Sequence, residues 1–299
     1  MGARDTFAVA VPGGELRGWT AGSGPKVLLL HGGPGLDYAY LDGLGAELEP
    51  EFHVAAYQQR GLEPSTVEGP FTIAQAIDDT VAVLDGLGWP QAFVVGHSWG
   101  GHLALRLVAA RPQRLLGALA VDPLGVVGDG GMAAFAAEMQ ARTVKEARDR
   151  AQELDQRAMA GQGTLEDAIE GLRLMWPSYF GDPEKVQPMP SISISLEAYA
   201  GIMEGIAEGF DGIAAALAGT EVRYGIVAGA ASPMPWGQAA RASAEVSPRA
   251  FLKVVPGAGH FPWFEVPGSV RSALNELARS RPADADAASE PEAMPALGA

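Results

Sequence analysis

The chain has 299 residues, a formal net charge of −15 and no cysteine. This charge argues against a nucleic-acid partner, whose phosphates it would repel, and the missing thiols exclude disulfides, a cysteine nucleophile and cysteine-ligated metals. Hydrophobic residues make up 47% of the chain and no apolar run is long enough to span a membrane, so the sequence predicts a globular, cytoplasmic protein without a membrane partner.

Short apolar runs alternate with helical patterns over the first 125 residues, which indicates an α/β fold with a mostly parallel sheet flanked by helices. The opening runs at 7–11 and 15–19 flank Pro12-Gly13-Gly14 and predict a hairpin. Later strands are expected at 27–30, 53–57, 92–95, 116–121, 222–227 and 251–255, and helices at 73–87, 101–108 and 267–279.

The strand rhythm stops between Gly125 and Gly219, where helical patterns cover 132–159, 164–175 and 196–217. A helical block inserted between two core strands predicts a cap over an active site. We therefore expect a first core segment (1–125), a helical cap (126–219), a second core segment (220–280) and a disordered tail rich in Ala, Pro, Glu and Asp (281–299).

A Gly-x-Ser-x-Gly turn, Gly96-His97-Ser98-Trp99-Gly100, lies between a predicted strand and a predicted helix. In this context a serine sits on a strained turn with its hydroxyl exposed. The spacing alone is weakly specific in a chain with 39 glycines, so the flanking strand and helix carry the prediction. Ser98 is therefore the candidate nucleophile.

A serine hydroxyl is a weak nucleophile until a base takes its proton, and the base is usually a histidine. His260 stands on a glycine-rich loop directly after the last predicted strand, where it can reach over the elbow serine. It is therefore the candidate base. Packing or turn geometry explains the other four more simply, namely His31, His53, His97 and His102.

Acyl transfer also needs two N–H donors aimed at the developing oxyanion. Trp99 supplies one, because it directly follows Ser98 at the start of a helix. The loop His31-Gly32-Gly33-Pro34-Gly35 follows a buried strand, as the His-Gly-Gly loops of esterases do, and Gly33 is expected to supply the other.

With these motifs the chain resembles the α/β-hydrolase superfamily, and within it the proline iminopeptidase-like branch. That branch combines the loop at 31–35, a Gln-Arg-Gly turn (59–61), the elbow at 96–100 and a Gly-His pair (259–260). The resemblance covers about 15–125 and 220–280. It implies an α/β-hydrolase fold with an inserted helical cap, and acyl transfer to water through an acyl-enzyme without a cofactor or metal.

Two positions depart from this family pattern. Gln58 stands where Asp usually precedes Gln-Arg-Gly, and Glu63 and Pro64 replace small and basic residues. More seriously, Ser232 stands where the triad acid is expected after the strand before the last.

The replacement acid we expect is Asp122. It follows the strand at 116–121, and some α/β hydrolases place their acid at that strand. A weakened Ser–His dyad is the alternative, and Asp122 would then be a turn carboxylate before Pro123.

Proline iminopeptidases use cap carboxylates to hold the free amino terminus of the substrate, and the resemblance extends this expectation to the cap here. Glu204 and Glu208 are one helical turn apart and share a helix face, and Trp176 is a candidate lining residue. The alternatives are a solvated helix face for the two glutamates and a place in the cap core for Trp176.

The first functional expectation is a serine aminopeptidase acting on peptides or amides with N-terminal proline or another small residue. The alternatives are a carboxylesterase or lactonase for small acyl esters, or a catalytically impaired ligand-binding protein of the same fold, as Ser232 suggests. Epoxide hydrolase and haloalkane dehalogenase chemistry are disfavoured because both need Asp at the elbow. The expected partner is a small-molecule or short-peptide substrate, and the sequence leaves the oligomeric state open.

Overall fold

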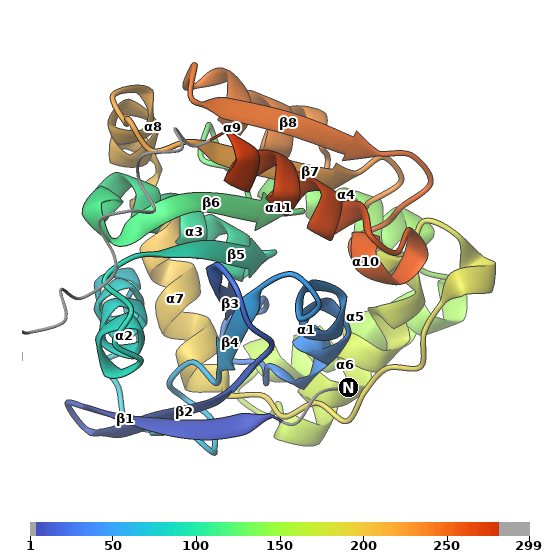
Figure 1. Cartoon of the computed structure of the whole chain (residues 1–299). Coiled ribbons are helices and arrows are strands. Elements are labelled where there is room, and N and C mark those ends of the chain that lie inside the picture. The colour runs from blue at the N-terminus through green and yellow to red at the C-terminus, as the bar shows by residue number, and fades with distance from the viewer. Residues whose placement is uncertain (1–3, 281–299) are drawn as a thin grey trace, which may run out of the picture.

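The computed structural model describes residues 4–280, apart from the side chains of Ala207, Glu208 and Asp211 (Figure 1). The tail predicted at 281–299 lies outside the described residues. The sheet has eight strands in the order β1-β2-β4-β3-β5-β6-β7-β8. Their bounds are β1 (Asp5–Val11), β2 (Gly14–Ala21), β3 (Lys26–Leu30), β4 (His53–Tyr57), β5 (Ala92–His97), β6 (Leu115–Val121), β7 (Tyr224–Gly229) and β8 (Ala250–Val255).

The predicted mostly parallel sheet is confirmed. β1 and β2 form an antiparallel hairpin whose second strand runs antiparallel to β4, and every remaining pairing is parallel. The order of the strands in the sheet differs from their order in the chain. For example, β3 lies between β4 and β5. The carboxyl ends of β3, β5, β6, β7 and β8 therefore point the same way, and loops after these strands meet at one edge of the sheet.

Helices cover both faces of the sheet, so its central strands are apolar on both sides. Leu28 and Leu30 of β3 belong to the core layer that includes α2 (Ile73–Gly86) and α3 (Trp99–Ala110). Val27 and Leu29 belong to the opposite layer, with α1 (Asp42–Leu48) and α11 (Ser269–Arg279). This alternation is the period of two expected of a strand.

The segment between β6 and β7 is helical (Figure 1). Its α-helices are α4 (Met132–Arg142), α5 (Lys145–Met159), α6 (Leu165–Met175), α7 (Leu196–Glu208) and α8 (Phe210–Ala218). Two predicted helices are divided. The pattern at 132–159 is interrupted where Thr143 and Val144 adopt extended backbone, and the pattern at 196–217 is interrupted at Gly209.

The helices of this segment differ in how they pack. α7 and α8 contribute Ile202, Ile206, Ile213 and Leu217 to the core layer that contains α3. In α5, by contrast, Leu154 is the buried residue. The short helices α9 (Ala242–Glu245) and α10 (Pro262–Glu265) follow in the second core segment. None of the helices in residues 4–280 is long and apolar enough to cross a membrane.

Candidate active site

Ser98 occupies a strained turn between β5 and α3, with φ 55° and ψ −117°. Positive φ is costly for a residue with a side chain, and such strain is concentrated at functional sites. The flanking glycines make the turn possible. A Cβ at Gly96 would lie 1.9 Å from the Gly100 oxygen, and a Cβ at Gly100 would lie 2.2 Å from the Leu30 oxygen.

The structure brings Asp122 and His260 together although they are far apart in sequence. The Nδ1 atom of His260, on the loop after β8, lies 2.5 Å from Oδ2 of Asp122, at the end of β6. Both side chains are buried. Asp122 also has positive φ (44°), and its backbone N–H donates to the Val227 oxygen at 2.6 Å. This backbone conformation fixes the direction of the carboxylate.

Ser232, at the position where the family pattern has its acid, contacts the same carboxylate. The Ser232 hydroxyl donates to Oδ2 of Asp122, and the Gly229 N–H donates to Oδ1 at 3.0 Å. The Ser232 oxygen in turn accepts the Met234 N–H at 3.0 Å. The carboxylate thus has donors on both oxygens, which fix its orientation toward His260.

The expected oxyanion residues border the same cavity as Ser98. Gly33 has φ 52°, and its backbone and Trp99 line this cavity together with Ser98 and His260. A Cβ at Gly33 would lie 2.2 Å from Leu36 Cδ1, so a side chain there would displace Leu36, and the positive φ also favours glycine.

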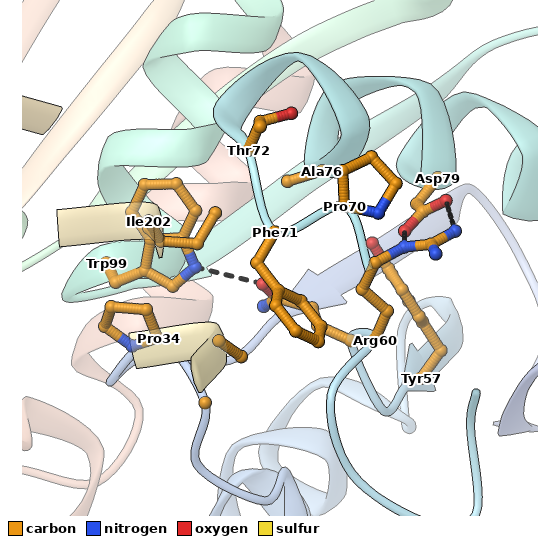
Figure 2. A pocket seen from close by; sticks show the side chains of 13 residues that line it. Pro34, Tyr57, Arg60, Pro70, Phe71, Thr72, Ala76, Asp79, Trp99 and Ile202 are labelled. Carbon is orange, nitrogen blue, oxygen red and sulfur yellow. Dashed lines mark hydrogen bonds and ion pairs between the residues drawn. The ribbon is translucent and has the colours of Figure 1, made fainter. Parts of the chain in front are cut away.

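Gln59 connects the loop at 31–35 to the elbow. Its side-chain amide donates to the His31 oxygen at 2.9 Å, and its Oε1 accepts the Trp99 indole N–H at 3.0 Å. Trp99, Phe71 and Ile202 line a pocket of about 20 Å³, which has room for about one water. Figure 2 shows these side chains around the pocket. The Arg60–Asp79 ion pair, 2.6 Å between Nε and Oδ2, closes the opposite side of this pocket (Figure 2).

A second hydrogen-bond chain joins the loop at 31–35 to the backbone of His260. The Gly32 N–H donates to the Tyr40 hydroxyl at 2.5 Å, and this hydroxyl lies 2.9 Å from Nδ1 of His97. Nε2 of His97 lies 2.9 Å from the His260 oxygen. The carbonyl can only accept, which assigns the His97 proton to Nε2 and makes Tyr40 the donor to Nδ1. Sequence reasoning placed His97 only within a turn.

Three buried histidines make the folded protein sensitive to acid. Burial lowers the pKa of His31 to about 4 and that of His102 to about 3, and it lowers the pKa of His97 well below its ordinary value. Below pH ~6.5 the unfolded chain binds protons at these positions while the folded chain does not. Each histidine should therefore remove ~1.4 kcal/mol of stability per pH unit as the pH falls from ~6.5 toward its folded pKa.

Urea unfolding followed by tryptophan fluorescence at pH 7, 6 and 5 tests this expectation. The free energy of unfolding should fall steadily over this range. His102→Gln should flatten the decline, and a stability that is constant between pH 7 and 5 would contradict the prediction.

A cavity of about 540 Å³ lies over Ser98. Five of the nine methionines line it, together with aromatic and aliphatic side chains; its lining includes Leu36, Leu124, Met132, Phe135, Met139, Leu172, Met175, Trp176, Tyr179, Ile192, Met203, Ile206, Met234 and Phe261. Polar exceptions from the cap are Gln140, Asp155 and Tyr199. Trp176 is among the lining residues, and it also belongs to the buried core layer that includes α1 and α11.

The structure does not bring Glu204 into this cavity. Tyr199, Met203 and Ile206 are the residues of α7 that line it, and Glu204 is exposed to solvent. The physical reason is helical spacing, since positions 199, 203 and 206 share one face and position 204 is turned about 100° away from Met203. The side chain of Glu208 lies outside the described residues.

In residues 4–280, no group of three or more His, Asp or Glu side chains is arranged to hold a metal ion. The sheet order, the helices on both faces and the strained Ser98 elbow together define an α/β-hydrolase-fold protein. The chain belongs to the alpha/beta hydrolase family, whose model matches residues 27–273.

Among curated relatives, the chain is similar to epoxide hydrolase B of Mycobacterium tuberculosis, with 37% identity over 102 residues, or 33% of this chain and 29% of that protein. It is also similar to the putative carbamate hydrolase RutD of Caulobacter vibrioides, with 38% identity over 95 residues, or 31% of this chain and 35% of that one. The chain thus matches only about a third of the length of each relative.

Solved structures match over nearly the whole chain. An α/β fold family hydrolase from Bacillus anthracis has a TM-score of 0.70 at 16% identity, covering 92% of this chain and 98% of that one. The enol-lactonase from Burkholderia xenovorans has a TM-score of 0.63 at 19% identity, covering 91% and 100%. At such identities the likeness establishes the fold.

Proposed function

We propose that this protein is a serine hydrolase that cleaves ester bonds through an acyl-enzyme. The observation that carries the proposal is the buried 2.5 Å contact between His260 Nδ1 and Asp122 Oδ2, at the cavity that also contains the Ser98 elbow. A nucleophile on a strained turn, a base and an oriented carboxylate are the three parts that acyl transfer needs.

In the proposed reaction Ser98 Oγ attacks the substrate carbonyl while Nε2 of His260 takes the hydroxyl proton. The N–H groups of Gly33 and Trp99 stabilise the oxyanion, and the charge of Asp122 stabilises the imidazolium. His260 then gives its proton to the departing alcohol. A water molecule then attacks the acyl-enzyme while His260 takes its proton. His260 returns this proton to Ser98 Oγ as the acid departs, which restores the free enzyme.

The cavity favours an uncharged ester or lactone with an apolar acyl group. A volume of about 540 Å³ falls within the range of pockets that enclose drug-sized ligands. Methionine side chains are flexible and polarisable, so a wall with five of them adapts to acyl groups of different shape. The names of two similar proteins, a carbamate hydrolase and an enol-lactonase, also refer to cleavage at a carboxyl-level carbon. Serine at the elbow disfavours the reaction named for epoxide hydrolase B.

Proline iminopeptidase-like aminopeptidase activity is the second candidate, and Asp155 is the observation that favours it. Among the described residues lining the cavity, Asp155 is the one carboxylate from the cap. Burial raises the pKa of the Tyr199 hydroxyl, and the Asp155 charge is a smaller cause in the same direction. A substrate ammonium at this position would gain a charged partner. Asp155 is exposed, however, and exposed ion pairs contribute little binding energy.

Labelling and a substrate panel test the proposal. A fluorophosphonate probe should label wild-type protein and fail to label Ser98→Ala. p-Nitrophenyl esters from acetate to octanoate should be hydrolysed with kcat/KM rising with acyl length, and proline arylamide should be a poor substrate. Faster cleavage of the arylamide would favour the aminopeptidase. Absence of both labelling and turnover would favour a ligand-binding protein.

The Asp155→Asn variant separates the two candidates by charge. If Asp155 holds a substrate ammonium, the variant should raise KM for amino-acid arylamides several-fold and leave ester hydrolysis unchanged. Glu204→Gln is the matched control, because Glu204 is exposed on α7 outside the cavity lining. Equal KM values for wild type and Asp155→Asn would exclude Asp155 from substrate binding.

A further inference from the structure

Glu265 is a buried carboxylate at the end of α10 that contacts two separate loops. It is 4% exposed. Its Oε1 accepts the N–H groups of Gly181 and Asp182, at 2.9 and 3.0 Å, and its Oε2 accepts the Gly259 N–H at 2.5 Å. Within residues 4–280 no cationic side chain forms an ion pair with this carboxylate. Lys185 donates instead to the Glu265 backbone oxygen at 3.3 Å.

The chemistry of these partners explains why the residue is a glutamate. All three groups that face the side chain are N–H donors, so the side chain must accept at both of its oxygens. A glutamine has one acceptor oxygen, and its NH₂ group would face either the cap amides or the Gly259 amide. The Gly259 amide is buried and the cap amides are partly buried, so a donor left unpaired at Gly259 would carry the full cost of desolvation and one left unpaired in the cap would carry part of it.

The two loops held by Glu265 belong to the cap and to the candidate base. Gly181 and Asp182 follow the cap turn Trp176–Tyr179, whereas Gly259 directly precedes His260. A further bond joins the loops, from the His260 N–H to the Tyr179 oxygen at 2.8 Å. They are in close contact, because a Cβ at Gly259 would lie 2.4 Å from both the Gly181 nitrogen and the Tyr179 oxygen.

We infer that Glu265 is a positioning residue for His260, a role that rests on the proposed hydrolysis. By fastening the cap segment 179–182 to the loop 257–260, it fixes the backbone from which His260 reaches Asp122. It also holds the Tyr179 ring against the imidazole, with centroids 5.3 Å apart. Without the Glu265 carboxylate, the His260 backbone keeps its hydrogen bonds to Tyr179 and His97. The preceding residue, Gly259, loses the hydrogen bond that holds its N–H group in place.

Glu265→Gln and Glu47→Gln form a matched pair for testing this role. Glu47 also accepts two backbone N–H groups, from Gly268 at 2.8 Å and Arg271 at 2.9 Å, but it contacts neither the cap nor the histidine loop. Both variants should lower the melting temperature. Only Glu265→Gln should lower kcat per titrated Ser98, by about 10- to 100-fold with KM within about twofold, as expected for a displaced catalytic group.

Active sites are titrated with the fluorophosphonate probe, so that an unfolded fraction does not count as slow turnover. Activity is measured with p-nitrophenyl butyrate well below the melting temperature. Glu265→Asp is the second variant should Glu265→Gln not fold. It keeps the charge, but a side chain shorter by one methylene cannot reach both loops, so kcat should again fall while the melting temperature falls less.

A spectroscopic measurement is independent of turnover. The low-field proton resonance of His260 Nδ1–H, assigned by its loss in His260→Ala, should shift or broaden in Glu265→Gln and remain unchanged in Glu47→Gln. The inference is overturned if Glu265→Gln keeps both the wild-type kcat per site and the wild-type resonance. The proposed function fails if wild-type protein neither hydrolyses the ester nor reacts with the probe. In that case the positioning role is still tested by the resonance, and an unchanged resonance in Glu265→Gln would overturn it.

Discussion

Ser98→Ala is expected to reduce kcat by a factor on the order of 10⁶, to a residual rate supplied by the oxyanion donors and by binding. The variant loses only the attacking hydroxyl, and the glycines at 96 and 100 still permit the turn. The melting temperature should therefore stay within a few degrees of wild type. Single-turnover kinetics with an aryl ester, together with probe labelling, measure the effect.

Two controls make this result specific. Ser243→Ala removes another buried serine hydroxyl, one that donates to the Ala239 oxygen, and should lower stability while leaving kcat unchanged. Ser98→Ala combined with His260→Ala should be little slower than either single variant, because nucleophile and base act as a unit. Near wild-type turnover by Ser98→Ala would overturn the assignment of the whole site.

Asp122→Asn is expected to lower kcat by up to ~10⁴ with little change in KM. The amide keeps the shape of the carboxylate but presents either an NH₂ group or a neutral oxygen to His260, so the imidazolium loses its stabilising charge. The Gly229 N–H and Ser232 hydroxyl, which both donate to the carboxylate, no longer face two acceptors. Steady-state kinetics across pH 6–9 measure the loss.

Ser232→Ala is the graded comparison. This variant removes one hydrogen-bond donor to Asp122 and leaves the charge of the carboxylate. We therefore expect kcat to fall about tenfold, the size expected for one hydrogen bond to a charged group. Ser232→Asp in the Asp122→Asn background should restore part of kcat, because position 232 already contacts the carboxylate at 122. If Asp122→Asn and Ser232→Ala have equal, small effects, Asp122 is not the acid.

Local signals in the sequence were sufficient for most of the fold. Short apolar runs between helical patterns predicted the strands of the sheet, and all eight observed strands overlap a predicted run. Helix breaks were harder to predict, because the pattern at 132–159 retains helix-forming residues up to the point where Thr143 turns to extended backbone. The short α1, α9 and α10 were not predicted, since helices of seven residues or fewer give little periodic signal.

The residues of the candidate site could be predicted where they lie in a recognisable local motif. Ser98, Gly33 and Trp99 carry their own glycine contexts, and His260 follows a recognisable strand. The supporting residues carry no such signal. Tyr40, Gln59 and Glu265 act through hydrogen bonds to residues as distant as His97, Trp99 and Gly181, and only the folded chain shows these pairs.

Glu204 shows the opposite limit. The helical repeat predicts that positions 204 and 208 share a face of the helix. It does not predict which face of the helix is turned toward the cavity. That choice depends on how α7 packs against the core through Ile202 and Ile206. The cavity then receives Tyr199 and Met203 instead of Glu204.

The position of α7 has a consequence for how substrate preference can change during evolution. Its Ile206 belongs to the core layer and also lines the cavity, so replacing it alters specificity and folding stability together. Lining residues on α4–α6 stand on helices with few buried positions. Natural variation in substrate range should therefore accumulate on α4–α6, where a change of side chain costs little stability, while α7 stays constrained.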